Sequence, residues 1–137
     1  AAIMEACVSH VAADAHQLPF RAGAFDRVWS ANVLYQCRMP TVVVDEIRRA
    51  LKPGGQWLGL ERIVPAWMRR RERERMDALN RANGTAERPW TLQDWQGFAG
   101  RMGVRLTVLP GRRVRSARLR RWLTVARPGR VVLEMPG

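Results

Sequence analysis

The stretch from Phe25 to Ile63 constrains the fold most, because it predicts a strand, a helix and a second strand joined by short connections. Arg27 to Leu34 is rich in apolar residues without strict alternation, which is typical of a strand covered on both faces. Trp57 to Ile63 is a second apolar run of strand length. Two strands connected through a helix are expected to lie parallel in one sheet, with a right-handed crossover.

The segment between these two strands has the pattern of an amphipathic helix. Thr41 is the expected N-cap, directly after Pro40. Apolar residues recur at helical spacing, while charged residues fill the opposite face. The apolar set consists of Val43, Val44, Ile47, Ala50 and Leu51. Pro53 cannot continue the helix, and Gly54 and Gly55 favour turn geometry, so we expect a tight turn before the second strand.

Four short motifs follow one another around this unit. An acidic residue and Leu-Pro-Phe lie between Asp14 and Phe20, and Phe25-Asp26 opens the first strand. The pattern E-x-x-R-x-L-K-P-G-G runs from Glu46 to Gly55, and the second strand contains Glu61. In this order and spacing, the motifs resemble the central part of class I S-adenosylmethionine-dependent methyltransferases. The most similar branch is the small-molecule group typified by ubiquinone and menaquinone biosynthesis enzymes.

The resemblance implies an α/β fold. We expect a partial Rossmann-like methyltransferase sheet, mostly parallel with an antiparallel C-terminal strand pair, and helices on both faces. In the family the strand order is three, two, one, four, five, seven, six. Cys7 to Ala13 would be strand three and Arg27 to Leu34 strand four.

The start of the chain predicts an N-terminally incomplete domain. The first residue is Ala1 rather than Met, and Ala1 to Ala6 has the pattern of the end of a helix. The family's cofactor site begins with a glycine-rich turn after strand one, and an acidic residue after strand two binds the ribose; neither is found here. Strand three would then close the gap, stay undocked or pair elsewhere. An exposed sheet edge favours association, so we expect poor stability or self-association.

A single domain, residues 1–137, is expected in three parts. Residues 1–63 form the central unit, 64–90 a variable Arg-rich helical insert, and 91–137 a C-terminal helix with strands. In the insert, Ala66 to Asn83 is helix-prone and Gly84 can end the helix. Two interpretations remain open for it: a mobile lid over a substrate pocket, or a solvated surface helix.

The C-terminal part begins with Thr91-Leu92-Gln93-Asp94, which has the pattern of a capping box. Apolar residues then lie on one helical face, and Gly103 ends the helix. That face consists of Leu92, Trp95, Phe98, Ala99 and Met102. Val104 to Val108 alternates as a half-buried strand does. Further strands are expected at Leu119 to Ala126 and Val131 to Leu133.

The net charge of +12 is placed unevenly. Residues 62–137 carry 18 Arg and six acidic residues, whereas residues 1–61 are balanced. A basic half can bind nucleic acid, an acidic protein or an anionic membrane. Since Lys52 is the only lysine, a compositional preference for Arg explains the charge equally directly. No run of membrane-spanning length is present, and Cys7 and Cys37 have neither metal nor disulfide spacing, which fits a reducing cytoplasm.

The site residues follow from the resemblance alone. Asp14 would accept a hydrogen bond from the adenine amino group of the cofactor, with the Ala15 N–H on a ring nitrogen; the alternative for Asp14 is a turn cap. The other expected cofactor-binding residues are His16 and Leu18 in the same loop and Ser30, Ala31 and Asn32 at the end of the first strand. His16 is either a general base or an exposed loop histidine. Tyr35-Gln36 stands where the family often has His, so no catalytic residue and no metal ligand is assigned.

Together these features predict S-adenosyl-L-methionine-dependent methyl transfer to a small-molecule acceptor, impaired by the missing part of the cofactor site. No membrane partner is expected, and nucleic acid is disfavoured because no nucleic-acid-binding motif is present. Two alternatives stay open. One is a non-catalytic basic module that uses its arginines and tryptophans to bind nucleic acid or an acidic protein. The other is a degenerate methyltransferase-like subunit that stabilises an active partner.

Overall fold

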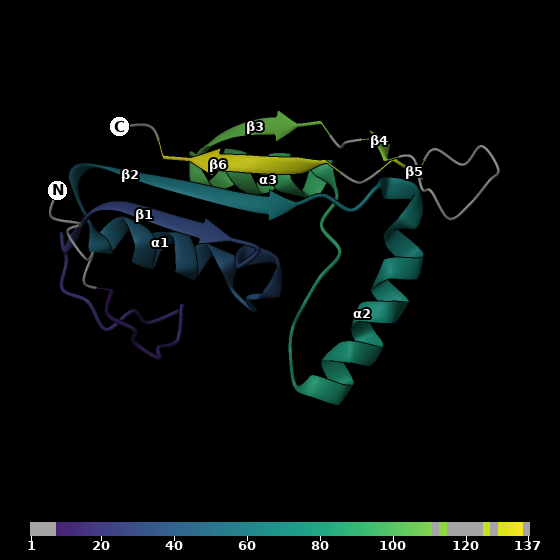
Figure 1. Ribbon diagram of the computed structural model, residues 1–137, viewed down its shortest axis with the longest axis horizontal. Coiled ribbons are helices and arrows are strands. Elements are labelled where there is room, and N and C mark those ends of the chain that lie inside the picture. Colours follow the sequence, from purple (N-terminus) through teal and green to yellow (C-terminus); the bar gives the residue numbers. More distant parts are fainter. Residues whose placement is uncertain (1–7, 111–112, 115–124, 127–128, 136–137) are drawn as a thin grey trace, which may run out of the picture.

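The computed structural model describes residues 8–110, 113–114, 125–126 and 129–135. Its main sheet has four strands in the order β1-β2-β6-β3, and β4 and β5 form a separate pair (Figure 1). The bounds of the strands are β1 Phe25–Ala31, β2 Leu51–Arg62, β3 Arg105–Leu109, β4 Arg113–Val114, β5 Val125–Ala126 and β6 Arg130–Glu134. The helices are α1 Pro40–Ala50, α2 Arg69–Asn83 and α3 Leu92–Met102, with short 3-10 turns η1 Leu34–Gln36 and η2 Ala66–Met68.

The predicted strand–helix–strand unit is present, and β1 and β2 are parallel. β1 begins earlier than predicted, at Phe25, and also ends earlier, at Ala31. It ends there because the next residue, Asn32, adopts a left-handed conformation with φ 56°. This conformation turns the chain out of the strand, and the η1 turn follows. The prediction that Thr41 caps α1 is wrong. Pro40 is already the first helical residue, where its fixed φ and missing N–H are harmless, and Met39 takes the N-cap position.

The Pro-Gly-Gly segment lies within β2 rather than before it. The register passes from Phe25–Leu51 to Arg27–Gln56, so β2 bulges at this point. Gly54 has φ 74°, and a Cβ on Gly55 would lie 2.9 Å from the Lys52 carbonyl oxygen. The positive φ favours glycine at position 54, and the close approach of the backbone requires it at position 55. The predicted strand Trp57 to Ile63 is the regular part of a longer, bulged strand.

The C-terminal part matches the predicted order of elements. Thr91 and Asp94 form a reciprocal capping box, and Gly103 ends α3 with φ 63°. β6 runs antiparallel to both of its neighbours, β2 and β3. β1, β2 and β3 therefore point the same way and β6 the opposite way. This reproduces the family order four, five, seven, six that the resemblance implies. Leu106 is half-buried, but β3 is an edge strand and Val108 is 44% exposed.

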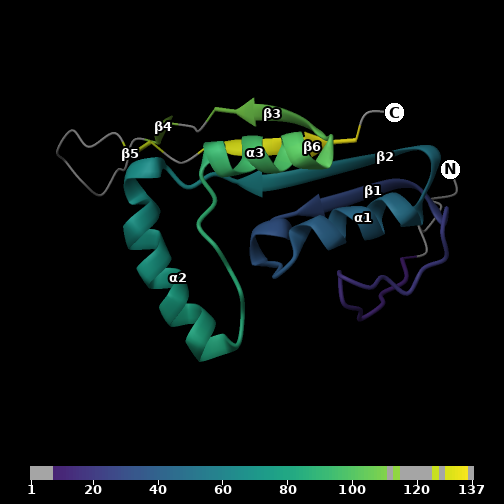
Figure 2. The ribbon, with the colours of Figure 1, turned by 180° about the vertical axis from the view of Figure 1, so that it is seen from behind.

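The core lies between the sheet and one layer of helices. Side chains of α1 and α3 pack in a single cluster with inward-facing residues of β2 and β6. Its members include Val43, Val44, Ile47, Trp57, Trp95, Phe98, Val131 and Leu133. In the reverse view α3 lies in front of β6, and α2 projects away from the sheet in both views (Figure 2).

The expectation of helices on both faces is not met among the described residues. The chain moves in one direction across the sheet, from β1 to β2 and then past β6 to β3. Successive right-handed crossovers in one direction place their helices on the same face. The other face carries Trp29, Leu58, Leu60 and Val132; Trp29 is 60% exposed and the other three are half-buried.

Two predictions concern the ends of the chain. Residues 8–13 are exposed and form no strand, so the strand expected at Cys7 to Ala13 is wrong for these residues, which have no neighbouring strand to pair with. Of the three arrangements considered for this strand, they show the undocked one. The helix end at Ala1 to Ala6, Cys7, Trp122 and all but the last two residues of the strand Leu119 to Ala126 lie outside the described residues. In the described part of the chain, no helix is long and apolar enough to cross a membrane.

Candidate functional site

The carboxyl end of β1 is shaped by backbone contacts. The Asn32 N–H donates to the carbonyl of Leu60, 2.8 Å away, and thereby extends the pairing with β2 by one residue. Immediately afterwards the N–H groups of Val33 and Leu34 donate to Glu61 Oε1, at 3.1 and 3.0 Å. The turn that leaves β1 is thus held by the end of β2.

Glu61 is fully buried beneath this turn. Burial raises the pKa of its carboxyl group, although the hydrogen bonds from the Leu34 and Val33 backbone act in the opposite direction. Its second oxygen, Oε2, has no hydrogen-bond partner among the described residues. A buried acidic side chain with one bonded oxygen and one unbonded oxygen is a high-energy arrangement when ionised. The motif spacing does not predict that Glu61 is buried beneath the turn after β1. The one feature of the sequence that indicates it is a lone acidic residue in an apolar strand.

Asp14 and His16 form a compact turn. The His16 N–H donates to Asp14 Oδ1 over 2.8 Å, and His16 Nδ1 lies 2.7 Å from the same oxygen. The N–H of Met39 donates to His16 Nε2 over 3.3 Å. Because a backbone N–H can only donate, Nε2 accepts and Nδ1 carries the hydrogen. His16 therefore links the Asp14 turn to the start of α1.

The Asp14 carboxyl group is largely exposed, and the His16 hydrogen bonds hold its pKa below the ordinary value. Only Oδ1 is engaged by His16. Among the described residues, Oδ2 and the N–H of Ala15 have no hydrogen-bond partner. The turn-cap interpretation of Asp14 thus holds for one oxygen, while the second oxygen and the next N–H stay available to a ligand.

Glu46 and Arg49 clamp the Leu-Pro-Phe loop to α1. Arg49 donates to both Glu46 oxygens at 2.8 Å, and to the carbonyls of Phe20 and Leu18 at 2.7 and 3.0 Å. The Leu18 N–H donates to Glu46 Oε2 at 2.8 Å. This bidentate pair lowers the Glu46 pKa to about 2. The E-x-x-R spacing therefore has a structural function.

The remaining predicted site residues divide by what they contact. Ser30 Oγ accepts a hydrogen bond from the Trp57 indole at 3.0 Å, so this hydroxyl belongs to the core side of the sheet. Ala31 is exposed, and Ala15 packs against the hydrophobic core. Leu18 contributes its backbone to the clamp. The structure places the Asp14 turn and the Asn32 turn at the same end of α1, and the carboxylates of Glu61 and Asp14 both act on the buried Cys37, whose pKa is raised mainly by burial.

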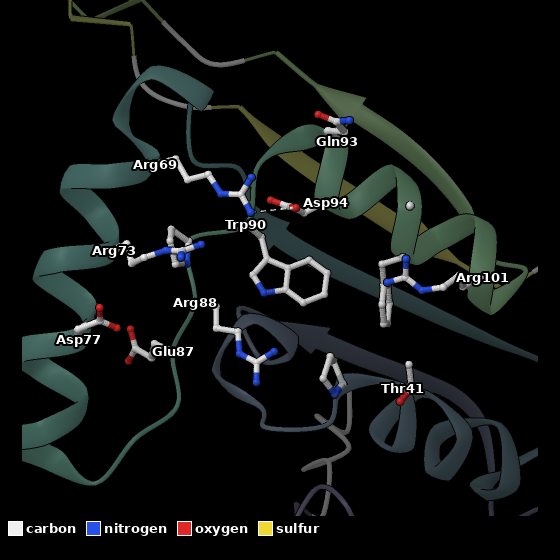
Figure 3. Close-up of a pocket in the computed structure, with 14 residues that line it drawn as sticks. Thr41, Arg69, Arg73, Asp77, Glu87, Arg88, Trp90, Gln93, Asp94 and Arg101 are labelled. Atoms are coloured by element: carbon white, nitrogen blue, oxygen red, sulfur yellow. Dashed lines mark hydrogen bonds and ion pairs between the residues drawn. The ribbon is translucent and has the colours of Figure 1, made fainter.

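A cavity of about 890 Å³ opens between the start of α1, α2 and α3 (Figure 3). It is lined by basic, acidic and aromatic side chains from these helices and from the segment that precedes α3. The lining residues are Pro40, Thr41, Arg69, Arg73, Asp77, Glu87, Arg88, Pro89, Trp90, Gln93, Asp94, Gly97, Phe98 and Arg101. α2 is thus one wall of a cavity as well as a largely exposed helix, and sequence analysis did not identify this set because its members come from three separate segments.

Comparison with known protein families finds a match over the first part of the chain. Residues 2–58 match the family described as "Methyltransferase domain". The matched range contains the Asp14 turn, β1, α1 and the clamp. It carries three of the four motifs, since Glu61 lies beyond its end.

Curated relatives match over less than half of the chain. A tRNA U34 carboxymethyltransferase from Hahella chejuensis is 46% identical over 48 residues, which are 35% of this chain and 15% of that protein. A malonyl-[acyl-carrier protein] O-methyltransferase from Erwinia pyrifoliae is 33% identical over 70 residues, 46% of this chain and 27% of that protein. The matched stretches therefore span well under a third of these relatives.

Solved structures show the same fold over most of the chain. A SAM-dependent methyltransferase from Thermotoga maritima aligns with a TM-score of 0.61 at 16% identity, over 89% of this chain and 60% of that one. Another from Aquifex aeolicus aligns with a TM-score of 0.55 at 10% identity, over 93% and 55%. The motifs, the strand order and these likenesses show that the chain has the fold of class I S-adenosylmethionine-dependent methyltransferases, and its residues 2–58 match a methyltransferase domain.

Proposed function

We propose that this chain supplies the adenine-side part of a cofactor site in a methyltransferase that acts on a small-molecule acceptor. One observation carries the proposal: Asp14 Oδ2 and the Ala15 N–H lie next to each other without a partner among the described residues, in a turn that His16 holds rigidly. An acceptor beside a donor matches the amino group and adjacent ring nitrogen of adenine. The residues present therefore fit this portion of S-adenosyl-L-methionine.

The other expected residues have supporting roles. Leu18, between the two clamp contacts, would border the adenine with Pro19 and Phe20. Asn32, at the turn after β1, would face the methionine part of the cofactor or the acceptor, with Ala31 beside it. Ser30 acts indirectly through its bond to Trp57. In open α/β sheets ligands bind beyond the carboxyl ends of the strands, which is where both turns lie.

S-adenosyl-L-methionine supplies a methyl group that its sulfonium already activates for attack. The protein therefore has mainly to bind, align the acceptor and exclude water. His16 uses both ring nitrogens for structure, so it is unsuited to take a proton from an acceptor. We assign no general base, and the reaction class proposed is one in which the acceptor's own nucleophilicity suffices or a base comes from another part of the protein.

Titration calorimetry with S-adenosylhomocysteine tests the proposal, using Asp14→Asn as the informative variant. Asparagine keeps an oxygen for the His16 turn but places an NH₂ group where the adenine amino group needs an acceptor. We expect roughly tenfold or greater weakening, as for loss of one buried hydrogen bond. Asp45→Asn, an exposed site on α1 paired only with Arg48, is the matched control. Equal affinity of both variants would exclude the adenine role of Asp14.

A second candidate is binding of nucleic acid or an acidic protein by the basic half of the chain. One curated relative is named for a tRNA nucleotide, and α2 exposes Arg70, whose side chain is 93% accessible. Binding to a random oligonucleotide that falls steeply with salt would favour it over a small-molecule acceptor. The degenerate-subunit alternative predicts no cofactor binding by the isolated chain, but stabilisation of an active partner.

A further inference from the structure

The cavity between α1, α2 and α3 concentrates positive charge from three segments. Arg69 and Arg73 extend from α2, Arg101 from α3, and Arg88 from the segment that connects them. Figure 3 shows the guanidinium groups of Arg69, Arg73 and Arg101 directed towards Trp90 from opposite sides. A solvated surface helix would not require such convergence.

Most of this charge is uncompensated within the described residues. Arg69 lies 3.4 Å from Asp94, whose carboxylate also accepts from the N–H and hydroxyl of Thr91 at 2.9 and 2.7 Å. Arg73, Arg88 and Arg101 make no ion pair with any carboxylate in that part of the chain. Asp77 and Glu87 lie together on the α2 side of the cavity in Figure 3, nearer to Arg73 than to Arg101. The guanidinium groups near Trp90 thus remain available for an anion.

Trp90 provides an aromatic surface at the centre of the cavity. Its ring packs on Trp95 with centroids 4.3 Å apart and meets the edge of Phe98 at 5.4 Å. Trp90 itself stays partly exposed, so these contacts fix the indole while leaving part of it in contact with the cavity. The Arg101 guanidinium lies over Gly97 on the surface of α3, since a Cβ there would lie 3.4 Å from it.

One short segment separates this cavity from the Asp14 turn. The Arg88 N–H donates to the Tyr35 carbonyl at 3.0 Å, and its side chain lies 3.5 Å from the Arg38 carbonyl. The next residue, Met39, donates to His16. Residues 33–39 therefore contact the cavity on one side and the proposed adenine turn on the other.

We propose that this cavity binds a small molecule with a planar apolar frame and a carboxylate or phosphate group. The guanidinium groups of Arg73 and Arg101, which line the cavity on opposite sides of Trp90, attract the anion, and the planar frame stacks on Trp90. If the proposed function is correct, this ligand is the methyl acceptor, because residues 33–39 contact both the cavity and the cofactor turn. The acceptor class is then an anionic aromatic compound or a compound of similar shape.

Calorimetry with the full chain and three matched probes tests this inference: naphthoate, naphthyl phosphate and neutral naphthylmethanol. We expect both anions to bind at least about tenfold more tightly than the alcohol, and their order tells carboxylate from phosphate preference. Arg73→Gln and Arg101→Gln should each weaken anion binding by about tenfold. Arg70→Gln, the same change on the outer surface of α2, should leave it unchanged.

The outcomes separate this inference from the proposed function because no cofactor is needed. If S-adenosylhomocysteine binds but the anions bind no better than the alcohol, the cavity assignment is wrong and the cofactor proposal stands. If the anions bind and the cofactor analogue does not, the cofactor proposal is wrong and the cavity assignment stands. Equal losses in Arg70→Gln and Arg73→Gln, or preference for a random oligonucleotide over both anions, would indicate a general basic surface and overturn the inference. Unchanged circular dichroism of each variant excludes misfolding as the cause.

Discussion

The pKa values of Glu61 and Glu46 are shifted in opposite directions, since Glu61 is buried and Glu46 is paired with an arginine. Glu61 loses solvation, which favours its neutral form, whereas Glu46 gains a bidentate partner, which favours its charged form. Sequence analysis identified both as members of one motif set. Their different environments follow from side-chain burial that no motif encodes.

Glu61→Gln should flatten the dependence of stability on pH. The folded-state pKa of Glu61 is raised above its ordinary value of 4.5, so the folded protein holds this proton more tightly. Its contribution is therefore greatest at acidic pH and is lost as pH rises through the raised pKa. Glutamine keeps an oxygen for the Val33 and Leu34 N–H groups without the charge. Thermal unfolding should be measured between acidic and neutral pH. At neutral pH the melting temperature of Glu61→Gln should equal or exceed that of wild type, whereas the exposed control Glu74→Gln should leave the pH dependence unchanged.

Glu61→Ala is the informative counterpart. It leaves two backbone N–H groups unpaired beneath the β1 turn, which costs about 1–3 kcal/mol of unfolding free energy for each buried group. If alanine and glutamine were equally stable in urea titrations, the hydrogen bonds from Val33 and Leu34 would not support the turn.

Glu46→Gln should loosen the Leu-Pro-Phe loop. The clamp lowers the Glu46 pKa from 4.5 to about 2. The stabilising effect of the clamp is therefore present above pH 4.5 and is lost as pH falls towards 2. We expect faster amide hydrogen exchange at Leu18 and Gly23 in the variant at neutral pH, with wild type approaching it in acid. Asp45→Gln, one residue earlier on the exposed face, should not change these amides; if it does, the effect is general to α1.

At the scale of elements, local chemistry predicted helices better than strand ends. α3 is specified by its own cap, apolar face and terminal glycine, all within its own sequence. The ends of β1 and β2 depend on the Asn32 turn and the Pro-Gly-Gly bulge, which exist only because the paired strands fix their register. A strand end is a property of a pair, whereas a helix end is largely a property of one segment.

Thr91→Ala should destabilise the fold by about 1 kcal/mol, since it removes the N-cap hydroxyl that accepts from the Asp94 N–H. Thr91→Ser should retain most of the stability because serine is an equally good cap. Thr107→Ala, on the exposed edge strand β3, is the control in urea denaturation. A loss as large in Thr91→Ser as in Thr91→Ala would assign the effect to methyl packing instead of capping.

At the scale of the whole molecule, β1 is an edge strand within the described residues, and no described helix covers the face that includes Trp29. The uncovered face follows from the one-directional path of the described chain across the sheet. An edge strand with an exposed large apolar side chain favours pairing with another chain. Self-association therefore remains a prediction for this chain.

Trp29→Lys should reduce that self-association. A charged side chain on an edge strand disfavours intermolecular pairing, and Trp29 lies on β1 away from the core. Sedimentation equilibrium should show a shift towards monomer, by roughly tenfold in dissociation constant. Trp67→Lys removes an indole that is 83% exposed but lies outside the sheet. An identical shift in both variants would point to general hydrophobicity as the cause.

Local periodicity and capping in the sequence predict the strand–helix–strand unit and the capped helix α3, and the motifs carry the resemblance that implies the strand order. Three further features depend on tertiary contacts: the one-sided helix layer, the buried Glu61 and the arginine-lined cavity. Each arises where segments far apart in the chain meet, and neither the direction of a crossover path nor the burial of a side chain is encoded in any single stretch of residues.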